Sequence, residues 1–159
     1  MSDLRYVIQY HIASMAHYDF RLEWRGTLLS WAIPKGPSFD PADRRLAVRV
    51  EDHDLDYRNF EGVIPAGYGA GTVMIWDEGF WLPASDVAEG LKKGSLKFII
   101  AGERLKGKWS LVKLPPDEKR KGDNWLLCKE QDEHAKDDSG ISDYSVSVRS
   151  GRTMEDIKL

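Results

Sequence analysis

The chain has 159 residues, of which 31% are charged, with a formal net charge of −3 and one cysteine. This length suits one compact domain that folds without a cofactor or crosslink, and a slightly acidic chain is not one that coats nucleic acid through a generally basic surface. A single cysteine excludes an intramolecular disulfide, and no apolar run approaches the roughly 20 residues of a membrane span, so we expect a cytoplasmic protein with no membrane partner.

Short segments with a period of two, rich in Val, Ile, Trp, Tyr and Leu, predict eight β-strands. In chain order they cover residues 5–11, 17–24, 27–33, 46–51, 71–76, 96–100, 108–113 and 125–129. The turn over residues 24–27 contains a glycine that can take a positive φ, which indicates a hairpin, and the prolines that follow Ile33 end the third strand. The pattern favours a mainly β fold, a compact antiparallel β-barrel of about eight strands with a few short helices.

Helices are expected only at residues 40–44, 85–93 and 153–158, the second of them capped by Ser85 and ended by Gly94. From about Gln131 the apolar density falls, and residues 137–140 have the composition of a linker. We therefore divide the chain into a β-barrel domain over residues 1–132 and a polar linker with a C-terminal tail over residues 133–159. This last stretch is either free or docked on the core.

His17, Asp19 and Arg21 are spaced by two, so on a strand their side chains emerge on one face. Together with His11 they offer imidazole and carboxylate ligands for a borderline divalent metal such as Mn, Fe or Zn, and a guanidinium fork for phosphate or carboxylate. The alternative is an ordinary solvated strand face, but such a face favours Lys, Glu, Thr and Ser. The stretch thus predicts a metal site beside an anionic substrate.

His53 lies among four carboxylates in residues 51–57. A protonated His53 could hold a phosphate oxygen or donate a proton, and a neutral one could bind metal; the sequence leaves both open, together with a purely structural bond to a neighbouring carboxylate. The glycine-rich run 62–71 lacks the ending of a phosphate loop and predicts a tight loop at the barrel rim. Tyr68 in that loop either reaches the substrate or packs over the barrel end. Cys128 is interpreted as a small buried hydrophobe, and His134 as a solvated bystander.

Several of these segments together resemble a known family. The motifs are QYHIASMAHYDFRLEW, LLSWAIPKGPSFDPADRRLAVRVEDHDLDYRNFEGVIP, YGAGTVMIWDEG, LKGKWSLVK and NWLLCKE. In this order they resemble the 3′-phosphoesterase domain of DNA ligase D, here interpreted as a stand-alone protein. SVRSGRTMEDI also resembles the segment that follows this domain in longer ligases.

The resemblance implies a small β-barrel enzyme, dependent on Mn²⁺ or another divalent transition metal, that heals 3′ ends of nucleic acid during DNA repair by non-homologous end joining. Such an enzyme removes a 3′-terminal ribonucleoside to leave a 3′-phosphate and then hydrolyses that phosphate to a 3′-OH. Its partners would be the 3′ ends of a primer-template and a DNA ligase and polymerase encoded separately.

Carried over by residue, the resemblance assigns the metal ligands to His11, His17 and Asp19 and the phosphate contacts to Arg21 and His53. Further positions in or around the site match Gln9, Glu51 and Tyr57, and basic side chains that meet the nucleic-acid backbone match Lys35 and Arg45. One departure is a loop one residue shorter than usual between Gly67 and Tyr68, which changes the substrate contacts expected there.

Two hypotheses from other classes are kept. His17, Asp19 and a distant His53 also fit the two-histidine, one-carboxylate triad of a non-haem iron oxygenase, which would make His11 a bystander. The other hypothesis is a non-catalytic module that binds DNA ends and recruits a ligase.

Overall fold

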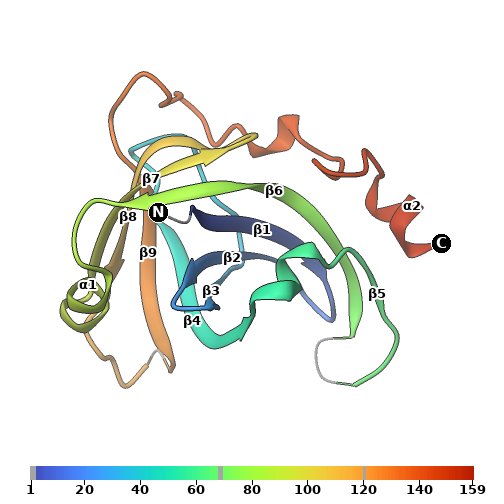
Figure 1. Ribbon diagram of the computed structural model, residues 1–159, viewed down its shortest axis with the longest axis horizontal. Helices are drawn as coiled ribbons and strands as arrows, with labels where there is room; N and C mark the ends of the chain where they lie inside the picture. The colour runs from blue at the N-terminus through green and yellow to red at the C-terminus, as the bar shows by residue number, and fades with distance from the viewer. Residues whose placement is uncertain (1–2, 68–69, 120) are drawn as a thin grey trace.

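The strands form one continuous antiparallel sheet that closes on itself (Figure 1). The computed structural model describes residues 3–67, 70–119 and 121–159. Within them the strands are β1 (Leu4–Ile12), β2 (Ala16–Trp24), β3 (Thr27–Ile33), β4 (Arg45–Asp54), β5 (Gly62–Ile64), β6 (Gly71–Pro83), β7 (Ser95–Gly102), β8 (Lys106–Lys113) and β9 (Asp123–Lys129). Their order is β1-β2-β3-β4-β9-β8-β7-β6-β5, and pairing of β1 with β6 closes eight of them into a barrel with β5 attached outside. The predicted barrel is confirmed.

All eight predicted strands are present, with bounds that differ by a few residues. The largest difference is β6, which continues to Pro83 because β1 pairs with it from Thr72 to Trp81, while β5 pairs with its first residues and β7 with its last. The pairing of β1 with β6 has a register shift between Ile8 and Gln9. The short strand β5 was not predicted, since it lies inside the range expected to be a glycine-rich loop. Tyr68 and its predicted role lie outside the described residues.

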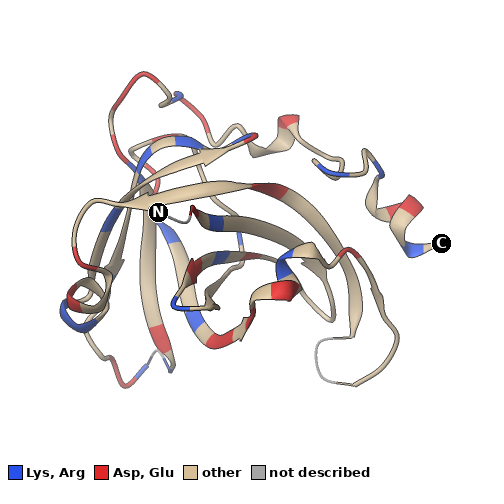
Figure 2. Cartoon of the chain, viewed as in Figure 1, with Lys and Arg blue, Asp and Glu red and all other residues tan. Residues whose placement is uncertain are grey.

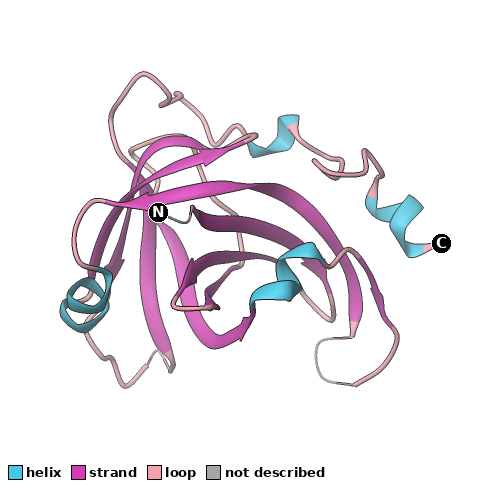
Figure 3. Cartoon of the chain, in the orientation of Figure 1, coloured by secondary structure: helices cyan, strands magenta, loops and turns pink. Residues whose placement is uncertain are grey.

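The helices are short, as predicted, but not all stand where the sequence placed them (Figure 3). Helix α1 (Val87–Lys93) is capped by Asp86 and not by Ser85, and α2 (Met154–Lys158) begins with a capping box at Thr153. The helix expected at residues 40–44 is wrong: Asp43 N–H bonds to the Asp40 carbonyl in an isolated turn. Two 3₁₀ helices, η1 (Leu55–Asn59) and η2 (Ile141–Asp143), were not predicted. Among the described helices, none has the length and apolar character needed to cross a membrane.

The barrel interior is packed with aromatic side chains. Five tryptophans are almost completely buried, namely Trp31, Trp76, Trp81, Trp109 and Trp125. The even-numbered residues of β1 and β2, such as Ile8 and Phe20, join this core. Because neighbouring strand residues point to opposite faces, the odd-numbered residues of the same strands lie on the outer face of the barrel wall. The predicted site therefore lies on the face of β1 and β2 that is opposite the apolar core.

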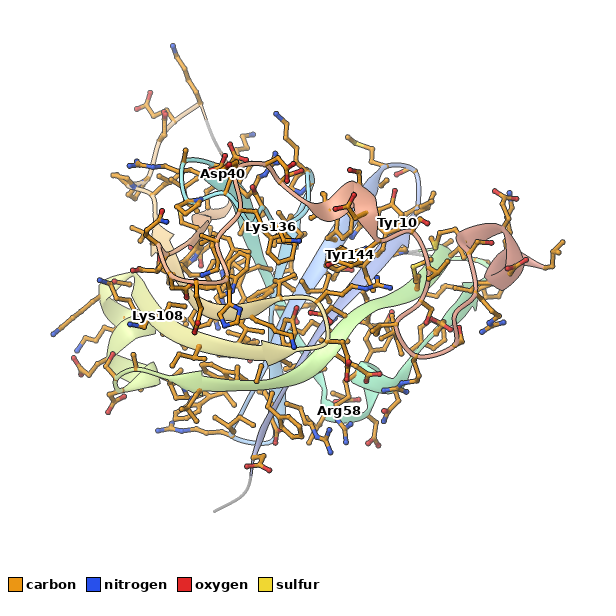
Figure 4. The ribbon with its side chains drawn as sticks, turned by 90° about the horizontal axis from the view of Figure 1, so that it is seen from above. Tyr10, Asp40, Arg58, Lys108, Lys136 and Tyr144 are labelled. Atoms are coloured by element: carbon orange, nitrogen blue, oxygen red, sulfur yellow. The ribbon has the colours of Figure 1, made fainter. Side chains whose placement is uncertain are left out.

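Residues after β9 run back along the outside of the barrel (Figure 1). The Trp76 indole N–H donates to the Tyr144 carbonyl at 2.9 Å, and Arg104 donates to the Val146 carbonyl at 2.7 Å. Ile157 of α2 is 5% exposed and belongs to the core cluster. Figure 4 shows Lys136, Tyr144 and Tyr10 on one side of β6 and Arg58 of η1 on the other. These contacts hold Tyr144, Val146 and Ile157 against the barrel.

Candidate active site

The hairpin β1–β2 brings the three predicted metal ligands together. In its antiparallel register His11 lies opposite His17, and Gln9 lies opposite Asp19. The imidazole rings of His11 and His17 are 5.0 Å apart between centroids. One ligand atom from each of His11, His17 and Asp19 lies within 4.8 Å of the other two, and this is the one such group of His, Cys, Asp and Glu among the described residues.

The charge at the centre of this group is the Asp19 carboxylate. It lies 3.2 Å from His17 Nε2, 3.7 Å from His11 Nδ1 and 3.3 Å from Arg21 Nη2. Burial raises the pKa of Asp19, but hydrogen bonds from the two histidines and the charge of Arg21 outweigh it, so the pKa lies well below its usual range. The hydrogen bond between His17 and Asp19 also raises the pKa of His17. An ionised carboxylate between two imidazoles is a donor set that suits a divalent transition metal.

Arg21 is 3% exposed, and its guanidinium contacts several polar side chains. Its Nε–H donates to Gln9 Oε1 at 2.7 Å, and Nη1 donates to Ser30 Oγ at 2.8 Å. Nη1 also lies 3.0 Å from His53 Nδ1. Together with the contact to Asp19, these bonds fix the guanidinium beside the metal-ligand group as a permanent positive charge.

Gln9 connects this network to the segment that covers it. Its side chain is completely buried, and its Nε2 donates to the carbonyls of Tyr57 at 2.8 Å and Phe60 at 3.1 Å. These bonds place η1 over β1 and β2, as Figure 3 shows. The Tyr57 ring centroid lies 5.0 Å from the Arg21 guanidinium carbon and 5.0 Å from the His53 ring centroid. The ring of Tyr57 therefore lies beside both of the predicted phosphate-binding residues.

His53 is a partly buried side chain near the end of β4. Burial and the charge of Arg21 lower its pKa, so it is neutral near pH 7. Its Nδ1 lies 3.0 Å from Arg21 Nη1, which can only donate, and 3.1 Å from the Glu51 carbonyl oxygen, which can only accept, so the two contacts favour opposite tautomers of the ring.

Three predicted site residues have other surroundings. The Glu51 side chain is exposed, and the residue reaches the site through its carbonyl oxygen, 3.1 Å from His53 Nδ1. Arg45 Nη2 lies 3.8 Å from Asp43 Oδ2, and Lys35 is exposed in the turn after β3. Because Tyr18 pairs with Ile33, the turn that carries Lys35 lies at the His17 end of β2.

Sequence reasoning missed Ser30 and Phe60. Ser30 is completely buried on β3, where its hydroxyl accepts from Arg21 and donates to the Leu28 carbonyl. A single serine inside the apolar strand TLLSWAI was a signal that could have found it. Phe60 contributes a backbone carbonyl, for which the sequence carries no signal.

The family is now clear from comparison. The model of the DNA Ligase D 3'-phosphoesterase domain matches residues 9–113, a range that includes the whole cluster from Gln9 to Phe60, and the chain belongs to this family. The resemblance stated from the motifs is thereby confirmed. The family name implies hydrolysis of phosphate esters.

The relatives are longer proteins. The chain is 55% identical over 134 residues to the "Multifunctional non-homologous end joining protein LigD" of Pseudomonas aeruginosa, which covers 84% of this chain and 16% of the relative. It is 41% identical over 122 residues to the "Multifunctional non-homologous end joining DNA repair protein LigD" of Mycobacterium tuberculosis, covering 76% and 15%. For the LigD of Mycolicibacterium smegmatis the identity is 38% over 136 residues, covering 81% and 17%. The chain thus spans about a sixth of the length of these relatives.

Proposed function

We propose that this chain is a metal-dependent phosphoesterase that acts on 3′ ends of nucleic acid, with Mn²⁺ or another divalent transition metal held by His11, His17 and Asp19. The observation that carries the proposal is that this ligand group contacts the buried Arg21 on one face of the β1–β2 hairpin, in a chain of a phosphoesterase family. A metal bound there supplies Lewis-acid polarisation of a phosphate oxygen and a bound water of lowered pKa.

The remaining roles follow from the contacts of the side chains. Arg21 provides a fixed positive charge toward the phosphate, because its own bonds prevent it from reorienting. His53 contacts a phosphate or leaving-group oxygen beside Arg21, whose Nη1 lies 3.0 Å from its Nδ1. Gln9 and Tyr57 hold these two groups in place. Lys35 and Arg45 bind the nucleic-acid backbone, and Glu51 supports His53.

The reaction we propose has two steps. The first removes a 3′-terminal ribonucleoside and leaves a 3′-phosphate, and the second hydrolyses the phosphate to a 3′-OH that a ligase or polymerase can use. The names of the relatives place those proteins in non-homologous end joining, and we propose the same process here, in the cytoplasm, with a separately encoded ligase and polymerase as partners. The catalytic domain is residues 1–132, and residues 133–159 are a docked tail.

The test uses four labelled primers on a common template, ending in a ribonucleotide or a deoxynucleotide, each with and without a 3′-phosphate. The proposal predicts Mn²⁺-dependent removal of the ribonucleoside and of both 3′-phosphates, with little removal of a terminal deoxynucleoside, because a 2′-OH is what distinguishes the two sugars. The chain is net acidic, and Lys35 and Arg45 can neutralise only a few phosphates, so rates should depend weakly on duplex length. The variant Asp19→Asn is the matched control and should abolish both steps.

Other outcomes separate the alternatives. Equal diesterase rates on the two sugars would point to a general 3′ exonuclease, and binding of the ends without turnover would point to a recruitment module. The oxygenase hypothesis is disfavoured by the geometry, because the ligand group contains His11 and not His53. Loss of metal binding on His53→Ala would restore it.

A further inference from the structure

Helix η1, which carries Tyr57 over the site, is weakly anchored by its own residues. None of its five residues is buried, and its N-cap Asp54 makes no side-chain capping bond. The bonds from Gln9 reach it from the barrel wall. Such an exposed single-turn helix needs further contacts to stay in one position.

Those contacts come from Arg149, 90 residues further along the chain. Its Nη2 donates to Asn59 Oδ1 at 3.1 Å, and its Nη1 lies 3.5 Å from the Asn59 carbonyl oxygen. The same guanidinium binds Glu78 of β6 in a bidentate pair, with Nη2–Oε1 at 2.6 Å and Nε–Oε2 at 3.1 Å. Arg149 therefore connects the last residue of η1 to the barrel strand β6. Figure 2 shows basic positions of the C-terminal segment near the acidic stretch of β6.

Arg149 is held by a turn that is itself well ordered by hydrogen bonds, residues 147–152, here called the 147–152 turn. Ser147 is 2% exposed, and its hydroxyl accepts from the N–H groups of Arg149 and Ser150. The N–H of Val148 donates to the Ile75 carbonyl of β6 at 3.0 Å. The turn is therefore fixed to the barrel without any help from η1.

The same turn also holds the chain just after η1. The Glu61 carboxylate accepts from Ser150 Oγ at 2.5 Å and from Arg152 at 3.3 Å, while its other oxygen accepts from the Ile75 N–H at 2.8 Å. Asn59 is thus bonded to the 147–152 turn, and Glu61 is bonded both to that turn and to strand β6. Gln9 binds the carbonyls of Tyr57 and Phe60 in the same segment, so this segment is also held from the barrel wall.

We propose that Arg149 is a positioning residue of the active site, which acts through Asn59 to keep Tyr57 against Arg21 and His53. The 147–152 turn follows β9, the last strand of the barrel, and lies outside residues 9–113, which match the family model. The effect on turnover rests on the proposed function, whereas the effect on the position of η1 does not.

The test combines hydrogen exchange with kinetics on the full chain. In Arg149→Ala we expect the amides of residues 55–61 to exchange at least fivefold faster while those of β8 do not change. With the 3′-phosphate primer, kcat should fall about tenfold and Mn²⁺ affinity should stay constant, because misplacing a group near the reacting atoms affects the rate more than the ligands. Lys93→Ala, which removes an exposed pair with Glu89 on α1, is the matched control and should change neither.

A cycle with Asn59 separates positioning from simple stapling of the tail. If Arg149 acts through Asn59, then Asn59→Ala should reproduce the exchange and kcat effects, and the double variant should add less than twofold. Arg149→Lys, which keeps the charge but not the bidentate fork, should recover only part of the rate. Unchanged exchange at residues 55–61 in Arg149→Ala, or fully multiplicative effects in the double variant, would overturn the inference. A wild-type protein without turnover would refute the proposed function and leave the exchange test valid.

Discussion

Gln9 is the residue whose replacement tests the site network most directly. It is completely buried, and it alone bonds both the Arg21 guanidinium and the carbonyls of Tyr57 and Phe60. Gln9→Met keeps the length of the side chain and leaves one charged donor and two carbonyls without this partner. The Tyr57 carbonyl still accepts from the Phe60 N–H, so the groups that lose their partner are the Arg21 Nε–H and the Phe60 carbonyl. Each costs about 1–3 kcal/mol when it stays buried and unpaired, and the partly exposed carbonyl can recover some of this from water.

We therefore expect the free energy of unfolding to fall by about 2–4 kcal/mol, which lowers Tm by roughly 5–10 °C for a chain of this size. We expect kcat for 3′-phosphate removal to fall by about a hundredfold, because Arg21 and Tyr57 both lose an orienting bond. Mn²⁺ affinity should change little, since Gln9 is not one of the three ligands.

The assay is denaturant unfolding, single-turnover kinetics and calorimetric Mn²⁺ titration on Gln9→Met and Gln9→Glu. The glutamate can still accept from Arg21 but cannot donate to either carbonyl, so it should keep more of the Arg21 function than methionine does while still releasing η1. A Gln9→Met protein with wild-type stability and a rate within twofold of wild type would refute the network as described.

Two further predictions concern charge. His53→Ala should lower kcat by about a hundredfold with metal binding kept, whereas His17→Ala should lose the metal. Burial and the charge of Arg21 lower the pKa of His53, and a protonated His53 is repelled by Arg21, so its protonation should contribute an acid limb below about pH 6.5 to the pH–rate profile. An acid limb that His53→Ala leaves unchanged would contradict this. Asp132 Oδ1 bonds the fully buried Lys129 ammonium at 2.7 Å, and the pKa of Asp132 is lowered to about 2. The stability that this carboxylate confers is therefore complete above about pH 4 and is lost as the pH falls toward 2. Asp132→Asn should cost about 2–4 kcal/mol in urea unfolding at pH 7 and flatten that acid dependence; equal stability at pH 7 would contradict the assignment.

The local sequence determined the strands and the face that carries the ligands. The spacing of His17, Asp19 and Arg21 by two places them on one side of β2 whatever the rest of the fold does, because successive strand residues alternate between faces. The turn at Arg25 and Gly26, both with positive φ, makes β2 and β3 a tight hairpin, so Ser30 necessarily lies opposite Arg21. The barrel class followed from the number of short strands separated by turns.

The tertiary structure decided which residues complete the site. Gln9 and Tyr57 are 48 residues apart, and Asn59 and Arg149 are 90 apart, so no local pattern could pair them. Their contacts depend on the closure of the barrel by β1 and β6, on the irregular course of η1 and on the docking of the C-terminal segment. These features depend on burial and hydrogen bonding summed over the whole chain, whereas periodicity records only the neighbours of each residue along the strand. For this reason the candidate metal ligands could be predicted from one hairpin, and the long-range contacts of Gln9 with Tyr57 and of Asn59 with Arg149 could not.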